Sequence, residues 1–314
     1  MGNLDKADSW QDYAELFGTT EEDEFEFLNP PRLIPTGIGK LDNEYLGGGM
    51  APGSYVLMAE PGAGKSAMAI QIAVNVAARG GKVLYVTAEM TRQQCLARAA
   101  SSLSAETGDQ NKAFKWSDWE RMGADPDGKR TGLAAMKLLR ERCPGLVFAD
   151  IERVRDLTSG EGSAEDVVTI AEGLAEHGLD MLVVDYLQWL QSPTYPDGHP
   201  VYKEELACIK ATSRTLCDAA KKLRIPVIAV STMSRTSRRS NDADLAGAYG
   251  SSGIEYDGTG VWQLRPGREK NLNGAEERHL HVVKNRRGPS HHKGEYLGLW
   301  LDGAHNRVTT TWEN

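Results

Sequence analysis

Cysteine is scarce in this sequence, and no two cysteines have the spacing of a metal-binding pair. Four cysteines occur in 314 residues, and none belongs to a CxxC motif. Zinc ribbons are built from such pairs, so their absence argues against a zinc ribbon. We therefore expect reduced thiols with mostly structural roles.

Long hydrophobic runs and targeting signals are missing as well. The longest apolar stretches are much shorter than the ~20 residues that a membrane span requires. The N-terminal stretch MGNLDKADSW lacks the basic-then-apolar pattern of a signal peptide, and Lys6 stands where myristoylation requires a hydroxyl. We expect no membrane partner, no lipid anchor and a cytoplasmic location.

The sequence also lacks an excess of positive charge. Its 36 Lys and Arg residues are outnumbered by 44 Asp and Glu residues, which gives a net charge of -8. This balance does not favour nucleic-acid binding through the outer surface. A locally basic channel remains compatible with it, because electrostatic steering depends on where charge lies. The 40% hydrophobic and 25% charged residues are typical of a soluble globular protein.

Residues 1–32 differ from the rest of the chain. Trp10, Tyr13, Ala14 and Phe17 follow the spacing of an apolar helix face, so we expect a short amphipathic helix there. The acidic run TTEEDEFEF and the prolines after it indicate a mobile linker. Because so short a helix is marginal alone, its aromatic face should dock on its own domain or on a neighbouring subunit.

Residues 33–314 alternate short apolar runs with helical periods, which predicts an α/β domain with a mostly parallel sheet. The near-continuous hydrophobicity of the early runs is typical of strands that helices cover on both faces. The expected strands are 54–59, 82–88, 146–150, 181–185, 226–231, 260–264 and 278–285, and the expected helices lie near 66–79, 91–103, 130–142, 163–177 and 203–223.

A glycine-dense stretch, AEPGAGKS, lies between the first strand and the first helix of this domain. It fits the phosphate-binding pattern G-x-x-x-x-G-K-[ST], with alanine in the first glycine place. Lysine at such a position reaches the β and γ phosphates, and the serine hydroxyl holds Mg²⁺. The alternative is an ordinary glycine-rich turn. The predicted residues for ATP are Ala59, Glu60, Pro61, Gly62, Ala63, Gly64, Lys65, Ser66 and Ala67, with Lys65 also catalytic and Ser66 also a metal ligand.

Two carboxylates follow predicted strands. Asp185 ends the apolar run MLVVD, as a metal-facing Walker B aspartate does, although an Asp at a strand end can simply cap a helix. Glu89 follows the strand after the first helix, where a carboxylate can polarise the attacking water. It can instead cap the helix that begins near Thr91. We predict Asp185 as a metal ligand and Glu89 as a catalytic residue.

A late strand carries two cations in KNRRGPS. Lys284 and Arg286 alternate along one face before Gly288. They are either an ordinary solvated edge or an arginine finger, which stabilises transition-state charge during phosphoryl transfer. Their position in the sequence does not decide between the two.

Seven motifs, taken in order, resemble the RecA-like motor domain of DnaB-type replicative helicases. They are TGIGKLDNEYLGGGMAPGS, AEPGAGKS, VTAEM, VVDYLQ, PVIAVSTMSR, YGSSGIEYDGTG and KNRRGPS, and the resemblance runs from about Pro35 to the C-terminus. It implies a RecA-like P-loop NTPase fold and a DNA-stimulated ATPase. It also implies a hexameric ring that moves 5′ to 3′ on single-stranded DNA in replication and hydrolyses ATP between subunits.

The same resemblance assigns residues to roles. It implies that Lys284 and Arg286 reach the neighbouring subunit's ATP, and that the helix around Trp10 to Phe17 clasps a neighbour. Channel-facing loops would hold DNA phosphates, although the arginines there can also be a solvated charge run. The predicted DNA-binding residues are Arg235, Arg238, Arg239, Gly250, Ser251 and Ser252.

Three departures keep alternatives open. Thr232 stands where the family usually has a γ-phosphate-sensing glutamine, and the sequence lacks the helical domain that recruits primase in full-length DnaB proteins. Two motifs are equally similar to RadA-type recombination ATPases, whose zinc cysteines and Lon-like domain have no counterpart here. The alternatives are a RadA-like branch-migration ATPase and a module that uses ATP only to assemble with a partner. By the same resemblance, a loader or a primase is a candidate partner.

Overall fold

The computed structural model describes residues 19–107, 113–119, 126–195, 197–233, 258–292 and 294–310. The chain forms two compact units, Met1–Arg32 and Leu33–Asn314. The helix expected at Trp10 to Phe17 and the DNA-binding residues expected at 235–252 lie outside the described residues.

In the first unit, helix α2 (Glu21–Leu28) occupies most of the segment that the sequence predicts to be a linker. That prediction is wrong because the acidic run contains its own start signal. The Thr20 side chain accepts from the Asp23 N–H, and the Asp23 carboxylate accepts from the Thr20 N–H at 2.7 Å, which forms a capping box. Acidic residues in a first turn also lie at the positive end of the helix dipole, so the charge run stabilises the helix.

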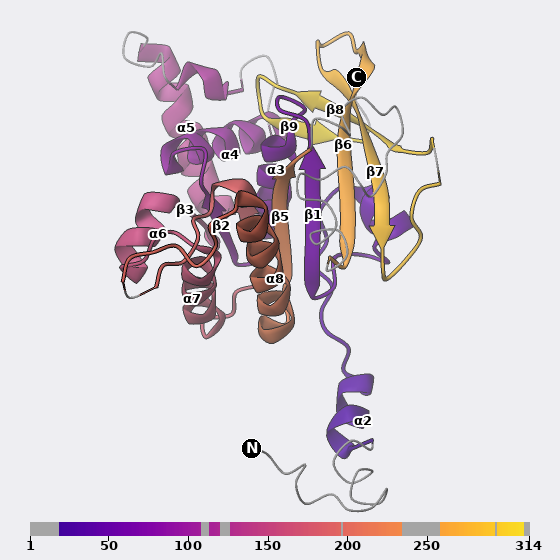
Figure 1. Ribbon diagram of the computed structural model, residues 1–314. Helices are drawn as coiled ribbons and strands as arrows, with labels where there is room; N and C mark the ends of the chain where they lie inside the picture. Colours follow the sequence, from indigo (N-terminus) through magenta and orange to yellow (C-terminus); the bar gives the residue numbers. More distant parts are fainter. Residues whose placement is uncertain are drawn as a thin grey trace, which may run out of the picture. The chain divides into compact units, whose positions relative to one another are not determined.

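The described strands of the second unit form one mixed sheet, drawn in Figure 1, in the order β3-β2-β4-β5-β1-β6-β7-β8-β9. Six strands run parallel, and the last three are antiparallel to their neighbours. The strands are β1 (Gly53–Ala59), β2 (Val83–Thr87), β3 (Leu146–Asp150), β4 (Met181–Asp185), β5 (Pro226–Thr232), β6 (Gly260–Lys270), β7 (Glu276–Asn285), β8 (Leu297–Asp302) and β9 (Arg307–Thr309).

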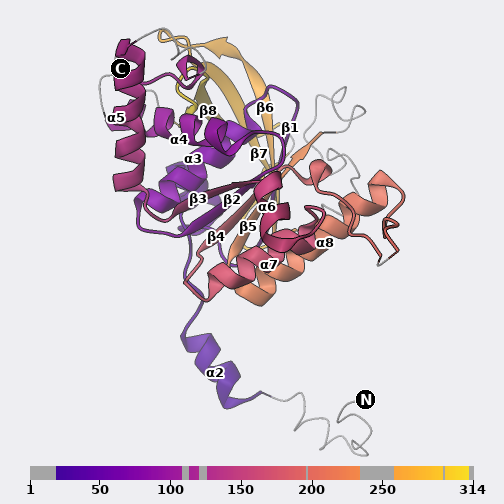
Figure 2. The same cartoon turned by 90° about the vertical axis from the view of Figure 1, so that its left-hand side faces the viewer.

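Helices cover both faces of the sheet, as Figure 2 shows: α3, α4 and α5 lie on one side and α6, α7 and α8 on the other. Every residue of β1, β2 and β4 is buried, which explains their continuous hydrophobicity. The mostly parallel, helix-covered sheet predicted from the sequence is therefore confirmed. The helices are α3 (Lys65–Ala78), α4 (Arg92–Thr107), α5 (Pro126–Arg142), α6 (Ile151–Thr158), α7 (Ala164–Ala175) and α8 (Glu205–Leu223).

Besides α2, helix α6 and strands β8 and β9 were not predicted. Helix α6 has only eight residues, and although Asp150 caps it, its apolar residues Ile151, Val154 and Leu157 form too short a run to stand out in the sequence. Strands β8 and β9 are short edge strands, and only alternate residues of β8 are buried. Such elements are defined by their partners in the sheet, and local sequence carries little signal for them.

The register of the parallel strands brings several strand ends to one edge. Ala59 at the end of β1 pairs with Thr232 at the end of β5, and Thr87 at the end of β2 pairs with Asp185 at the end of β4. Ligands of open α/β sheets bind at this carboxyl edge. The fold therefore assembles, at one place, side chains that are far apart in the sequence.

Candidate functional site

The loop between β1 and α3 has the backbone of a phosphate cradle. Gly62 and Gly64 have φ values of 79° and 98°, in the left-handed region, and Gly64 caps the N-terminus of α3. A Cβ on Gly64 would lie 2.7 Å from Leu301 Cδ2, so the position also lacks room for a side chain. Successive N–H groups in such a turn, together with a helix N-terminus, form an anion-binding site. The predicted phosphate-loop residues 59–67 all lie here.

Asp185 lies beneath this loop, fully buried at the end of β4. Its Oδ2 accepts a hydrogen bond from the Tyr85 hydroxyl at 2.7 Å. Burial raises the pKa of the Asp185 carboxyl, whereas the hydrogen bond from Tyr85 and the nearby Ser66 hydroxyl and Lys65 ammonium act to lower it. The fold thus gathers Lys65, Ser66 and Asp185 into one polar cluster.

The donor set fits a magnesium ion. Asp185 Oδ1 is buried and has no hydrogen-bond partner among the described residues, and the Ser66 hydroxyl is close to the same carboxylate. No group of three His, Cys, Asp or Glu side chains suited to a metal occurs in the described part of the chain. Magnesium is usually held by one or two protein ligands, with phosphates and water completing its shell, so this sparse set is appropriate.

Lys65 and Glu89 complete the cluster from two sides. Lys65 is 8% exposed, and its Nζ lies 5.1 Å from the centroid of the Tyr186 ring, a cation–π contact. Glu89 follows β2 and is exposed, and its negative charge is close enough to raise the pKa of Asp185. An exposed carboxylate beside a buried one at a phosphate loop is suitably placed to act on water.

Sequence reasoning missed Arg98 on α4. Its guanidinium lies 3.9 Å from the centroid of the Trp116 ring and donates to Asn306 Oδ1 at 3.4 Å. Burial lowers the pKa of Arg98, and the charges of Asp185 and Glu89 are among the neighbouring groups that act to raise it. A second cation therefore lies near the two carboxylates. The only signal in the sequence was one charged residue inside the small-residue run LARAASS.

Thr232, the last residue of β5, lies beside a glutamine that sequence reasoning did not single out. The Gln188 amide Nε2 donates to Ser231 Oγ at 2.8 Å, and the Thr232 N–H approaches Gln188 Oε1 at 3.5 Å. Gln188 belongs to the turn after β4, so these contacts join the ends of β4 and β5.

Lys284 and Arg286 lie at the opposite edge of the sheet from the phosphate loop. Lys284 on β7 pairs with Val261 near the start of β6, and Asn285 pairs with Gly260, which is level with Tyr55 on β1. The Arg286 N–H donates to the carbonyl of Thr259, the residue before β6, at 2.9 Å. Arg286 therefore lies beyond the amino end of β6. Four residues of β1, about 13 Å, separate Tyr55 from Ala59. The structure therefore does not bring these two cations to the phosphate loop of their own chain.

Two histidines, the buried His281 and the half-buried His291, hold the segment that carries Arg286 in place. The Val282 N–H donates to His291 Nδ1 at 2.7 Å, so the neutral ring donates from Nε2 to the Tyr45 hydroxyl at 2.7 Å. His281 on β7 donates from Nδ1 to the Glu295 carbonyl at 2.8 Å. Burial lowers the pKa of His281 to about 4 and also lowers the pKa of His291.

These depressed pKa values predict a loss of stability in mild acid. Both histidines are neutral in the folded state, so their contribution is complete above the unfolded pKa of 6.5 and declines as the pH falls toward about 4. Between pH 7 and pH 4.5, the melting temperature should fall about 3–6 °C further in the wild type than in His281→Gln. His199→Gln, which changes an exposed histidine, is the control and should match the wild type. Identical pH profiles for His281→Gln and the wild type would contradict the assignment.

A known protein family matches most of this chain. The family model described as DnaB-like helicase C terminal domain matches residues 34–294, well over half of the chain. The chain belongs to this family. The replicative DNA helicase DnaB of Pasteurella multocida is 30% identical over 213 residues, which cover 65% of this chain and 39% of that protein. The DnaB of Buchnera aphidicola is 27% identical over 76% of this chain and 48% of that protein.

Solved structures agree on the fold. A DnaB-like replicative helicase, solved in a study of its interactions with primase, matches with a TM-score of 0.71 and 17% identity, covering 98% of this chain and 71% of the other. A separately solved ATPase domain matches with a TM-score of 0.68 and 18% identity, covering 96% of this chain and 98% of the other. These similarities confirm the RecA-like P-loop ATPase fold that the motifs imply.

The RadA alternative has weaker support. The DNA repair protein RadA of Synechocystis is 45% identical to this chain, but over only 65 residues, which are 20% of the chain and 13% of that protein. The DnaB-type interpretation is therefore favoured over the RadA-type one. The chain spans between about two fifths and one half of the length of the DnaB relatives named above. Among the described helices, none is long and apolar enough to cross a membrane.

Proposed function

We propose that this chain is a DnaB-type, DNA-stimulated ATPase that assembles as a ring, hexameric by family resemblance, and moves 5′ to 3′ along single-stranded DNA in the cytoplasm. One observation carries the proposal: the phosphate loop and Arg286 lie at opposite edges of the same sheet. A site that needs both must take them from two chains. This is the arrangement expected of an enzyme that hydrolyses ATP at subunit boundaries.

Each residue of the cluster has a role in this proposal. Backbone N–H groups of 62–66 and the Lys65 ammonium hold the phosphates of ATP. Ser66 and Asp185 hold Mg²⁺, which neutralises charge on the phosphate oxygens when bound. Glu89 orients and deprotonates the attacking water, and its exposure leaves room for that water. Lys284 and Arg286 of the adjacent subunit stabilise the charge that develops on the transferred phosphoryl group.

Helix α2 supports the proposal that assembly is between copies of this chain. Phe25 and Leu28 are 67% and 76% exposed and lie one turn apart on a helix whose first four residues are acidic. A groove of about 560 Å³ between α4 and α5 is lined by Leu96, Leu133 and Met136 and has a basic rim of Arg92, Lys137 and Arg140. The apolar lining of the groove can accept Phe25 and Leu28, and its basic rim can pair with the acidic residues of the helix. The groove is therefore complementary to α2 of a second copy.

DNA binding remains assigned to the segment that begins directly after β5, with Arg235, Arg238, Arg239, Gly250, Ser251 and Ser252. The described residues just before it include Thr232, which pairs with Ala59 of the phosphate loop, and this motivates the assignment together with the family resemblance. Arginines and backbone amides would hold phosphates without reading bases. A primase or a loader would be a further partner, by analogy with the DnaB-like helicase whose primase interactions are known.

ATP turnover with and without single-stranded DNA tests this function. A translocating motor should hydrolyse ATP at least about tenfold faster with a single-stranded oligonucleotide, because binding of the strand favours the conformation that hydrolyses ATP. Duplex DNA should stimulate less. The competing proposal, motivated by Thr232, is a module that uses ATP only to assemble with a partner. Slow turnover that single-stranded DNA leaves unchanged would favour that module and contradict the motor.

A further inference from the structure

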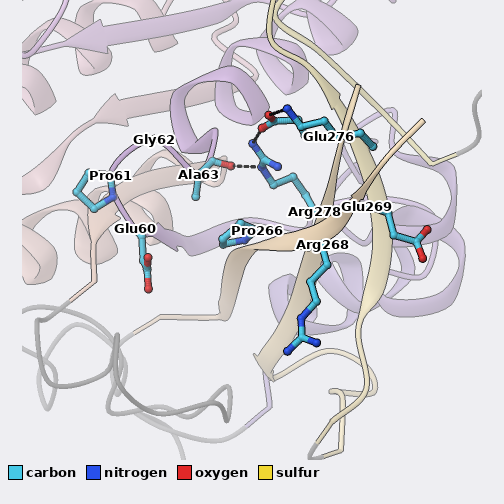
Figure 3. Close-up of a pocket in the computed structure, with 11 residues that line it drawn as sticks. Glu60, Pro61, Gly62, Ala63, Pro266, Arg268, Glu269, Glu276 and Arg278 are labelled. Atoms are coloured by element: carbon cyan, nitrogen blue, oxygen red, sulfur yellow. Dashed lines mark hydrogen bonds and ion pairs between the residues drawn. The ribbon is translucent and has the colours of Figure 1, made fainter. Parts of the chain in front are cut away.

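Arg278 on β7 ties the phosphate loop to the antiparallel part of the sheet. Its Nε donates to the Ala63 carbonyl at 2.8 Å, and Ala63 lies in the middle of the loop. Figure 3 shows the guanidinium bonded to this carbonyl, with Arg268 directed away from it. Both arginines line a cavity of about 310 Å³. Arg278 and Ala63 are 215 positions apart in the sequence.

The guanidinium is held on all sides. Arg278 is 5% exposed, its Nη1 donates to the Glu277 carbonyl at 2.8 Å, and its Nη2 donates to Glu276 Oε2 at 2.8 Å. Lys270 Nζ lies 2.9 Å from the other oxygen of Glu276. A buried guanidinium with three partners has a fixed orientation, because breaking any one bond would leave a buried donor unsatisfied.

The loop has few restraints of its own: the Ala63 N–H donates to the Glu60 carbonyl at 3.1 Å, but the Ala63 carbonyl on the next peptide is held by Arg278. Glycines flank Ala63 on both sides, and a Cβ on Gly62 would meet nothing within 4 Å. Glycine leaves the chain more backbone conformations than other residues do, so the hydrogen bond from Arg278 restricts the peptide between Ala63 and Gly64. That peptide is trans, so the Gly64 N–H points opposite to the carbonyl that Arg278 holds.

We propose that Arg278 is a positioning residue for nucleotide binding: by holding the Ala63 carbonyl, it turns the Gly64 N–H toward the phosphates. Arg278 itself is on the far side of the loop and touches no phosphate in this role. The inference depends on the proposed function only for the identity of the ligand, a nucleotide. It does not depend on DNA binding, ring formation or a finger supplied by a second subunit.

ADP affinity, measured by calorimetry on the full chain in Mg²⁺ buffer, tests the proposal. Arg278→Met should bind ADP about tenfold more weakly than the wild type, because one cradle donor loses its orientation. Arg278→Lys can still donate to the Ala63 carbonyl and should lose about threefold. Arg268→Met removes an exposed cation from the same cavity and should bind ADP as the wild type does.

A thermal melt of each variant without nucleotide separates positioning from simple stabilisation. If Arg278 only braces the hairpin between β6 and β7, Arg278→Met and Arg278→Lys will lower the melting temperature and leave the ADP affinity unchanged, which would overturn the inference. An equal loss of ADP affinity in Arg268→Met would also overturn it, because removing any positive charge near the cavity would then weaken ADP binding. A wild-type chain that binds no ADP would refute both the inference and the proposed function.

Discussion

Arg286→Ala should lower ATP turnover by at least about a hundredfold while the protein still assembles and still binds nucleotide. Arg286 lies near the amino ends of the parallel strands, away from the phosphate loop of its own chain. Its loss therefore leaves the phosphate cradle intact and removes only charge stabilisation in the transition state. Arg287→Ala is the matched control, because Arg287 is the adjacent exposed arginine and should tolerate the change.

Mixing two inactive variants tests whether each ATP site is shared between two chains. Lys65→Ala removes the phosphate-binding ammonium and should be as inactive as Arg286→Ala. When the two variants are mixed, some boundaries combine an intact Lys65 from one chain with an intact Arg286 from the other. Part of the activity should then return. A mixture that assembles and stays inactive, or an Arg286→Ala protein that turns over like the wild type, would refute the finger from a second subunit.

Glu89→Gln should separate hydrolysis from binding. Replacing the carboxylate with an amide removes the base and should slow ATP hydrolysis about a hundred- to a thousandfold. ADP affinity should stay within about twofold, because Glu89 lies after β2 and not in the phosphate loop. Single-turnover hydrolysis and ADP calorimetry on the same preparation measure the two effects.

Glu106→Gln is the control for Glu89→Gln. Glu106 is an exposed glutamate on α4, and its loss should change neither quantity. If Glu89 only capped the helix that begins at Arg92, Glu89→Gln would lower the melting temperature slightly and hydrolyse ATP at nearly the wild-type rate. That result would leave the site without an assigned base.

The order of elements in the second unit was predictable because its central parallel strands β1, β2 and β4 are buried on both faces. The runs from Ser54 to Ala59 and from Met181 to Asp185 are nearly all apolar, and both are strands in the structure. Helix α2 was not predicted, because a run of acids suggests repulsion unless the capping box at Thr20 and Asp23 is recognised. Charge composition alone therefore gave the wrong local structure.

The supporting residues of the site were not predictable. Tyr85 bonds to Asp185 across 100 positions, and Arg278 bonds to Ala63 across 215. Such pairs depend on strand order and register, which local periodicity does not encode. A single tyrosine or arginine inside a strand gives no indication of which distant strand it will meet.

The sequence by itself determined the phosphate loop, its serine and lysine, and the two carboxylates at strand ends, because these chemistries depend on short, local residue patterns. Only the tertiary structure decided that Arg286 lies at the opposite edge from that loop and that Arg278 lies against it. Both residues belong to one neighbourhood in the sequence, but β7 is extended and antiparallel to β6. Eight residues along such a strand span about 26 Å, which carries the two arginines to opposite edges of the sheet.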